Sequence, residues 1–183
     1  MEYTIDFKCV NDNYDDITEE AVQKSGVSFP EVHYSGEDMA KLAKAVRICD
    51  RDTMSMVPFC MTVEAEAFGA DIKMGDMKKG PRVSNYVFKN MEDFEKIKPI
   101  DLNKGRISQV LKAVKILSSS GEKTALAVQG PFTIMSSLTD PRTFYKAIRK
   151  DKTLVDDFME VIIDGIVAFA EAGIKSGANI ISF

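Results

Sequence analysis

The sequence is poor in the residues that build disulfide frameworks and metal centres. Its 183 residues include three cysteines and one histidine. Cys9, Cys49 and Cys60 are scattered and odd in number, so we expect reduced thiols rather than disulfides. His33 lies in the polar segment Glu31-Val32-His33-Tyr34, where we predict a surface loop. No spacing brings these four side chains together, so no metal site is predicted within this chain.

Long hydrophobic runs and an excess of basic charge are also missing. No apolar window reaches the roughly 18 residues that suggest a membrane span. Met1 to Val10 has neither the basic start nor the apolar middle of a secretory signal. We therefore predict a cytoplasmic protein that does not contact membranes. The formal net charge of −4 gives little reason to bind nucleic acid, and the basic residues at 146–152 are interpreted as a solvated helix end.

The composition is that of an ordinary globular domain. Hydrophobic residues make up 45% of the chain and charged residues 28%, which is enough for one core. The chain is shorter than the roughly 250 residues of a complete (β/α)8 barrel. We expect residues 1–183 to form a single, incomplete domain, with 1–14 as a flexible N-terminal segment.

Three short apolar runs carry the fold prediction. The run at 123–128 ends abruptly at Gln129-Gly130-Pro131 and is followed by a predicted helix. The run at 53–57 is stopped by Pro58-Phe59-Cys60 and is again followed by a helix-like segment, and a third run occupies 179–183. This pattern is typical of buried parallel strands that feed strand-to-helix loops, where α/β barrels keep their chemistry.

Helical periodicity fills most of the sequence between these runs. Helices are predicted over 15–25, 37–49, 62–68 and 91–98, from Asn103 to about Leu117, from Pro141 to about Arg149, and after a cap at Asp151 or Thr153. Asp71 to Met74 is predicted as a short strand or edge, and 75–83 as the most loop-like segment. The order β-α-α-β-α-β predicts an α/β class with parallel strands, which corresponds to about half of a TIM-like barrel.

Three segments resemble the uroporphyrinogen decarboxylase superfamily. They are Val57-Pro58-Phe59-Cys60-Met61-Thr62-Val63-Glu64-Ala65-Glu66-Ala67-Phe68-Gly69-Ala70, then Gln129-Gly130-Pro131-Phe132-Thr133, and then Ala172-Gly173-Ile174-Lys175-Ser176-Gly177-Ala178-Asn179-Ile180-Ile181-Ser182. The Glu-Ala-Glu-Ala-Phe-Gly segment and Phe29-Pro30-Glu31 are most similar to the methylcobamide:coenzyme M methyltransferase branch. The resemblance covers about Asp15 to Phe183. It implies a (β/α)8 barrel with its pocket at the carboxyl ends of the strands.

The resemblance also implies an activity, a metal and a partner. Members of the methyltransferase branch move a methyl group from a methyl-corrinoid, as methylcobalamin or on a corrinoid protein, to a zinc-bound thiol such as coenzyme M. Their zinc ligands are a His-x-Cys pair and a later cysteine in the second half of the barrel. This chain has no His-x-Cys pair. We therefore expect no activity from this chain alone, with the catalytic residues beyond Phe183 or on another chain.

Two alternatives remain open. The first is a uroporphyrinogen decarboxylase-like protein of tetrapyrrole metabolism. The decarboxylases of the superfamily use an arginine-containing loop and a tyrosine, whereas this chain lacks such a loop and has Ser137 at the position of the tyrosine. The second is a non-catalytic half-barrel that acts as an accessory or interaction protein. An open half-barrel leaves an unpaired strand edge, so we expect a homo-oligomer or association with a complementary half-barrel.

The predicted pocket lies where the strand-end loops converge. Its candidate residues are Phe59, Glu64, Gln129, Gly130, Pro131, Phe132, Thr133 and Ser137. Glu64 and Glu66 cannot share a helix face at i, i+2, so we expect Glu64 at the rim of the pocket. Gln129 could reach a ligand or bond the loop backbone, and Pro131 could simply begin a helix. Cys60 is interpreted as a small buried apolar group.

Overall fold

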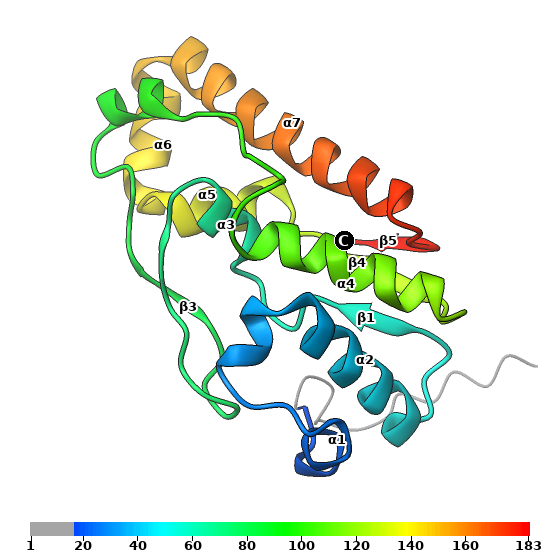
Figure 1. The fold of residues 1–183 in the computed structure, drawn as a ribbon. Helices are drawn as coiled ribbons and strands as arrows, with labels where there is room; N and C mark the ends of the chain where they lie inside the picture. The colour runs from blue at the N-terminus through cyan, green and yellow to red at the C-terminus, as the bar shows by residue number, and fades with distance from the viewer. Residues whose placement is uncertain (1–16) are drawn as a thin grey trace, which may run out of the picture.

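The central feature of the fold is a parallel sheet. The computed structural model describes residues 17–183, so the predicted flexible segment 1–14 lies outside the described residues. Strands β1 (Ser55–Val57), β4 (Thr124–Ala127) and β5 (Ile180–Ser182) pair in the order β1-β4-β5 (Figure 1). Both pairings are parallel, so the carboxyl ends of all three strands lie at one edge of the sheet. The three predicted strands are therefore confirmed.

Three long helices cover this sheet. Helices α2 (Gly36–Asp50), α4 (Gly105–Ser119) and α7 (Lys152–Lys175) pack beside β1, β4 and β5 respectively (Figure 1). A cap at Asp151, whose carboxylate accepts a hydrogen bond from Leu154 N at 3.0 Å, begins α7. Gly173 lets α7 approach the sheet closely, because a Cβ there would lie 2.2 Å from Leu126 Cδ2. Within residues 17–183, no helix is long and apolar enough to span a bilayer.

The amino-terminal helices form a small separate core. Helix α1 (Glu19–Ser25) begins after Thr18 and the 3₁₀ helix η1 (Glu31–Tyr34) precedes α2. His33 lies in η1 and is 3% exposed, with its ring 5.6 Å from that of Phe29 in an edge-to-face arrangement. The prediction of a surface loop at His33 is therefore wrong. The polar neighbours of His33 face outward, whereas its ring fills a space between η1 and the rest of this core.

A hairpin extends from the connection between β1 and α4. After α3 (Val63–Ala67), strands β2 (Asp71–Lys73) and β3 (Arg82–Asn85) pair antiparallel, and the 3₁₀ helix η2 (Met91–Lys96) follows. The predicted helix at 62–68 and edge strand at 71–74 are confirmed. The loop prediction is wrong for the start of β3, because Val83 is the only apolar residue of that strand and gives no alternating pattern. Helix α4 begins at Gly105 rather than Asn103, since Asn103 N bonds Asp101 Oδ1 at 3.0 Å in a preceding turn.

Helices α5 (Pro131–Leu138) and α6 (Pro141–Lys150) lie between β4 and α7. An aromatic cluster joins this part to η2. The rings of Phe94 and Phe158 stack at 4.3 Å, and Phe88 meets Phe158 edge-on at 5.3 Å. The cluster holds η2, α6 and the amino-terminal half of α7 together, and so fixes the hairpin relative to α5.

Candidate functional site

A buried arginine organises the loop that follows β1. The side chain of Arg106, at the start of α4, is 1% exposed and forms an ion pair with Glu66 of α3. Its guanidinium also donates to Thr62 Oγ1 at 2.9 Å, Thr62 O at 3.3 Å and Cys60 Sγ at 3.2 Å. These contacts offset the cost of burying the charge and tie the β1–α3 loop to α4. Cys60 is half-buried and accepts a hydrogen bond, so it is not the purely apolar group predicted.

The sequence contained a signal for Arg106 that the predictions did not use. Arg106 shares the helix face of Val110, Ala113 and Leu117, all of which are buried. An arginine whose helical position falls on the apolar face of an amphipathic helix is either buried or lies at the end of that face. Its partners Cys60 and Glu66 lie at least 40 residues away in the chain, so the sequence could not identify them.

Glu64 fixes the loop that follows β4. Glu64 is 1% exposed, and its Oε1 accepts a hydrogen bond from Gln129 N at 2.8 Å. Its Oε2 has no hydrogen-bond partner among the described residues, and burial raises the pKa of this carboxyl above its ordinary value. The predicted position at the rim is therefore wrong. Glu66 forms an ion pair with Arg106. Glu64 and Glu66 therefore have separate partners on separate faces of α3, as their i, i+2 spacing predicts.

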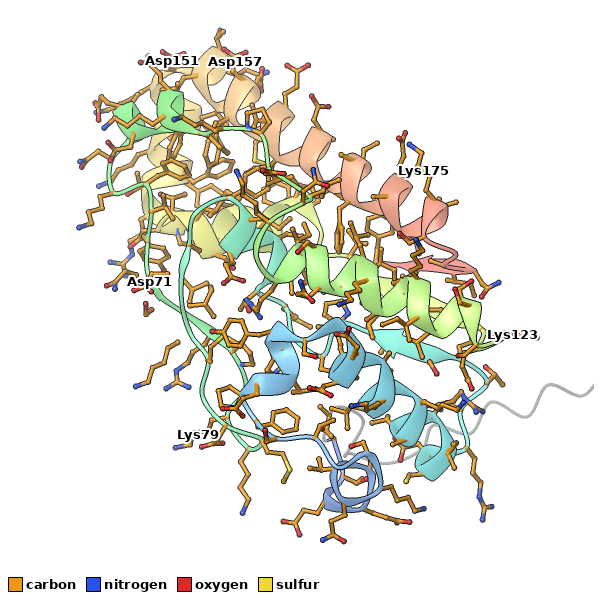
Figure 2. The ribbon with its side chains drawn as sticks, in the orientation of Figure 1. Asp71, Lys79, Lys123, Asp151, Asp157 and Lys175 are labelled. Carbon is orange, nitrogen blue, oxygen red and sulfur yellow. The ribbon has the colours of Figure 1, made fainter. Side chains whose placement is uncertain are left out.

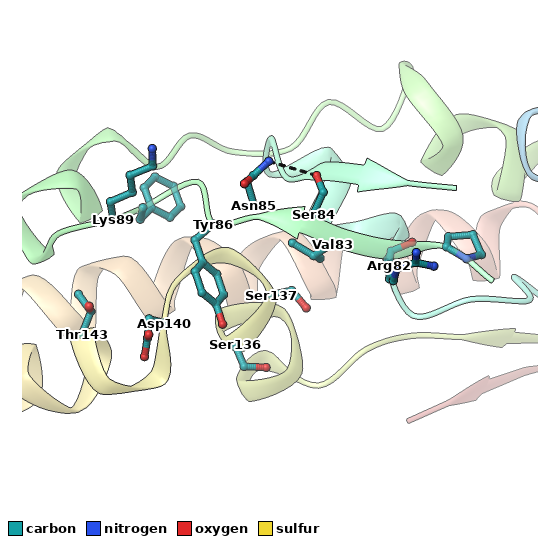
Figure 3. Close-up of a pocket in the computed structure, with 13 residues that line it drawn as sticks. Arg82, Val83, Ser84, Asn85, Tyr86, Lys89, Ser136, Ser137, Asp140 and Thr143 are labelled. Atoms are coloured by element: carbon teal, nitrogen blue, oxygen red, sulfur yellow. Dashed lines mark hydrogen bonds between the residues drawn. The ribbon is translucent and has the colours of Figure 1, made fainter. Parts of the chain in front are cut away.

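A large cavity, here called the hairpin groove, lies between the hairpin and helices α5 and α6 (Figure 3). Its volume is about 790 Å³. At one end, Phe88 N donates to Leu138 O at 3.0 Å and Thr139 Oγ1 donates to Phe88 O at 2.8 Å, which ties the segment after the hairpin to the α5–α6 junction. The lining residues are Thr62, Pro81, Arg82, Val83, Ser84, Asn85, Tyr86, Phe88, Lys89, Ser136, Ser137, Asp140 and Thr143.

A second cavity, here called the strand hollow, lies at the carboxyl ends of β1 and β4. Its volume is about 340 Å³, and Met56, Phe59, Met61 and Ala127 give it largely apolar walls. Cys60 and Gln129 also line it. Apolar walls with a few polar groups are typical of small-molecule sites.

The predicted pocket residues divide between these two cavities. Phe59 and Gln129 line the strand hollow, and Ser137 lines the hairpin groove. Gly130 caps α5 and Pro131 begins it. The carbonyl of Thr133 accepts hydrogen bonds from the hydroxyls of Ser136 and Ser137 at 2.9 and 3.0 Å. Phe132 is 61% exposed and lies outside both cavities. The residues share the predicted end of the sheet, but they do not surround a single mouth.

The described residues do not fit a zinc site. Within residues 17–183, no three His, Cys, Asp or Glu side chains are placed to hold a metal ion together. The sulfur of Cys60 faces the guanidinium of Arg106, whose charge opposes a second cation there. Burial, with a smaller contribution from Arg106, lowers the pKa of His33 to about 4.

Comparison with known proteins assigns the family. The model of the family described as uroporphyrinogen decarboxylase (URO-D) matches residues 15–183. The chain belongs to this family. Methylcobamide:CoM methyltransferase MtbA of Methanosarcina acetivorans is 37% identical over 168 residues, which are 90% of this chain and 49% of that protein. MtbA of Methanosarcina mazei has the same identity and coverage, and MtaA of Methanosarcina barkeri is 32% identical over 89% of this chain.

A solved structure supports the same assignment. A methyltransferase from Methanosarcina mazei superposes with a TM-score of 0.78 at 28% identity, over 88% of this chain and 49% of that chain. The chain thus spans about half the length of the relatives it matches. The predicted family, its methyltransferase branch and the partial TIM-like barrel are confirmed.

Proposed function

We propose that this chain provides one half of an enzyme that moves a methyl group from a methyl-corrinoid to a thiol such as coenzyme M. The observation that carries the proposal is 37% identity to methylcobamide:CoM methyltransferases across 90% of the chain. Residues 1–183 then form one incomplete domain. A second half-barrel, on another chain or on a longer form of this one, supplies the missing strands.

In this proposal, the described residues position the substrate. Arg106 and Glu64 hold the loops after β1 and β4 in fixed positions, so the walls of the strand hollow are preorganised. The apolar side chains of Met56 and Phe59 suit the flat face of a corrin ring. Hydroxyl and amide groups of the hairpin groove suit the amide side chains at the ring's periphery.

Zinc, if the enzyme uses it, is held outside the described residues. The donor set required is absent from 17–183, where Cys60 faces a cation and His33 packs against Phe29. No step is therefore assigned to zinc in this half. The partners that fit are methylcobalamin or a corrinoid protein, together with the complementary half-barrel, and a cytoplasmic location is consistent with such substrates.

The test is reconstitution with a complementary half. The half of Methanosarcina mazei MtbA that this chain does not match is produced separately and mixed with the 183-residue chain. Methyl transfer from methylcobalamin to coenzyme M is then followed by the corrinoid absorption spectrum and by loss of free thiol. We expect transfer by the mixture and none by either half alone. A stable complex without transfer would favour the non-catalytic accessory protein instead.

The same preparation tests the loop residues. Gln129→Ala and Phe132→Ala are expected to slow methyl transfer without unfolding the chain, because both alter the loop at the carboxyl end of β4. Conversion of uroporphyrinogen to coproporphyrinogen above a heat-killed control would favour the decarboxylase alternative. We expect none, since the chain has no arginine-rich loop to bind the carboxylates of that substrate.

A further inference from the structure

A cationic hollow adjoins one end of the hairpin groove. Its volume is about 260 Å³, and its lining residues are Lys89, Asn90, Met91, Glu92, Thr143, Lys146 and Lys150. Three lysines thus face one glutamate around a small concave surface. We call it the lysine hollow. Lys89 and Thr143 also line the hairpin groove, so the two cavities are adjacent.

The lysines come from two separate elements. Thr143, Lys146 and Lys150 are spaced i, i+3, i+7 on α6, which places them on one face of that helix. Lys89 precedes η2 and lies across from Thr143 at the same end of the groove (Figure 3). The aromatic packing of Phe94 against Phe144 and Phe158 holds the two elements together beneath the hollow.

The lysine charges are not neutralised within the described chain. Several exposed lysines form ion pairs, as Lys96 does with Asp93 at 2.6 Å and Lys152 with Asp156 at 2.5 Å. Among residues 17–183, Lys89, Lys146 and Lys150 form none. Asp140, the acidic residue in the lining of the groove, accepts a hydrogen bond from Arg142 N at 2.7 Å. Glu92 alone opposes three ammonium groups in the hollow.

We propose that the lysine hollow binds a tetrahedral oxyanion on a ligand that occupies the hairpin groove. The inference rests on the proposed function, which supplies two sources of such a group. A cobamide carries a phosphodiester in its nucleotide loop, and coenzyme M carries a sulfonate. The groove, at about 790 Å³, is far larger than coenzyme M requires and smaller than a whole cobamide. It therefore favours a cobamide whose nucleotide loop enters the groove while much of the corrin ring lies outside it.

The position of the groove supports an extended ligand. Thr62 lines the groove and bonds Arg106 at the strand ends, whereas Lys89 and Thr143 lie at the end that joins the lysine hollow. A cobamide in this groove would place its corrin ring toward the strand ends and its phosphodiester among the lysines. The lysines then position the substrate and take no part in methyl transfer.

Binding of corrinoids to the 183-residue chain tests the proposal without turnover. Equilibrium dialysis, read by visible absorption, compares cyanocobalamin with dicyanocobinamide, which lacks the phosphodiester together with the ribose and base of the nucleotide loop. The lysine variant below separates the contribution of the phosphodiester from that of the base. We expect cobinamide to bind about tenfold more weakly or worse, since charge-assisted hydrogen bonds are lost. A triple variant, Lys89→Gln with Lys146→Gln and Lys150→Gln, should bind cobalamin as weakly as the parent binds cobinamide.

A matched variant controls for net charge. Lys78→Gln, Lys79→Gln and Lys98→Gln together remove the same charge from exposed positions outside the cavity, Lys79 being near the tip of the hairpin (Figure 2). This variant should bind cobalamin within about twofold of the parent, and circular dichroism should show all variants folded. A second dialysis measures 2-mercaptoethanesulfonate. Lysine-dependent binding of that thiol, with equal binding of the two corrinoids, would support the oxyanion site and identify the sulfonate as its ligand.

The proposal is overturned if neither ligand shows binding that depends on these three lysines. Absence of binding by both ligands counts as the same result. Because the dialysis measures binding, its result on the oxyanion site stands even if the reconstituted enzyme fails to transfer methyl groups. Conversely, active reconstitution with lysine-independent binding would sustain the proposed function and reject the oxyanion site.

Discussion

Arg106 connects the two segments whose relative position defines the strand-end site. Replacement with methionine keeps much of its volume but removes every donor to Thr62 and Cys60 and leaves Glu66 without its ion pair. We expect Arg106→Met to lower the free energy of unfolding by about 3 kcal/mol. Urea unfolding followed by circular dichroism measures the change. Arg142→Met, an exposed control, should change it by less than about 0.5 kcal/mol, and equal losses in both variants would contradict the role given to Arg106.

His33 makes stability depend on pH. Its pKa is lowered to about 4 chiefly by burial, while the unfolded chain retains the ordinary value of 6.5. The unfolded state therefore binds more protons between these values, so the contribution is complete above pH 6.5 and is lost as the pH falls toward 4. The loss should approach about 3 kcal/mol at the lower limit. His33→Gln should remove most of this slope, and an unchanged slope would show that other groups cause it. The raised pKa of Glu64 acts in the opposite direction but is common to both proteins.

At the scale of elements, α7 separates a buried face from an exposed one. Ile162 is fully buried, whereas its neighbour Ile163 is 45% exposed (the helix runs along one side in Figure 2). We expect Ile162→Asp to cost more than about 4 kcal/mol, because it buries a carboxylate without a partner. Ile163→Asp should cost far less when measured on the monomer, because that side chain is 45% exposed within one chain. Thermal unfolding of the two variants checks this, and similar losses would mean that α7 is rotated from its described position.

The elements that could be predicted are those whose signal is local. The runs at 53–57 and 123–128 are short and apolar, and proline or glycine ends each of them. These local sequence features are sufficient to predict both as strands. Strand β3 could not be found this way, since Arg82, Ser84 and Asn85 are polar and the strand depends on pairing with β2. Burial of His33 and the convergence of Arg106 on Cys60 arise from tertiary contacts across the chain. The hairpin groove likewise could not be predicted from the sequence, because it forms only when tertiary contacts place the hairpin over α5.

At the scale of the whole molecule, one surface carries several exposed apolar side chains next to an open strand edge. Ile163, Val167 and Ile174 form an exposed stripe on α7. Ile180, in strand β5, which follows α7 in the sequence, is 48% exposed. Among the described residues, β5 pairs only with β4, so its other edge is open. An open strand edge next to an apolar helix stripe favours association with another chain.

We therefore expect the 183-residue chain to form dimers or larger oligomers when it is produced alone. Light scattering at micromolar concentration measures this, and a monodisperse monomer would exclude it. Val167→Lys with Ile174→Lys should shift the population toward monomer, because each substitution places a charge in the stripe without changing the core. Lys substitutions at Asp157 and Asp164, which are exposed on another side of the same helix, provide a control and should leave the oligomers in place. If the surface forms the interface with a complementary half-barrel, addition of that half should also dissociate the oligomers. Self-association that persists in the presence of that half would instead assign the surface to contacts with a second copy of this chain.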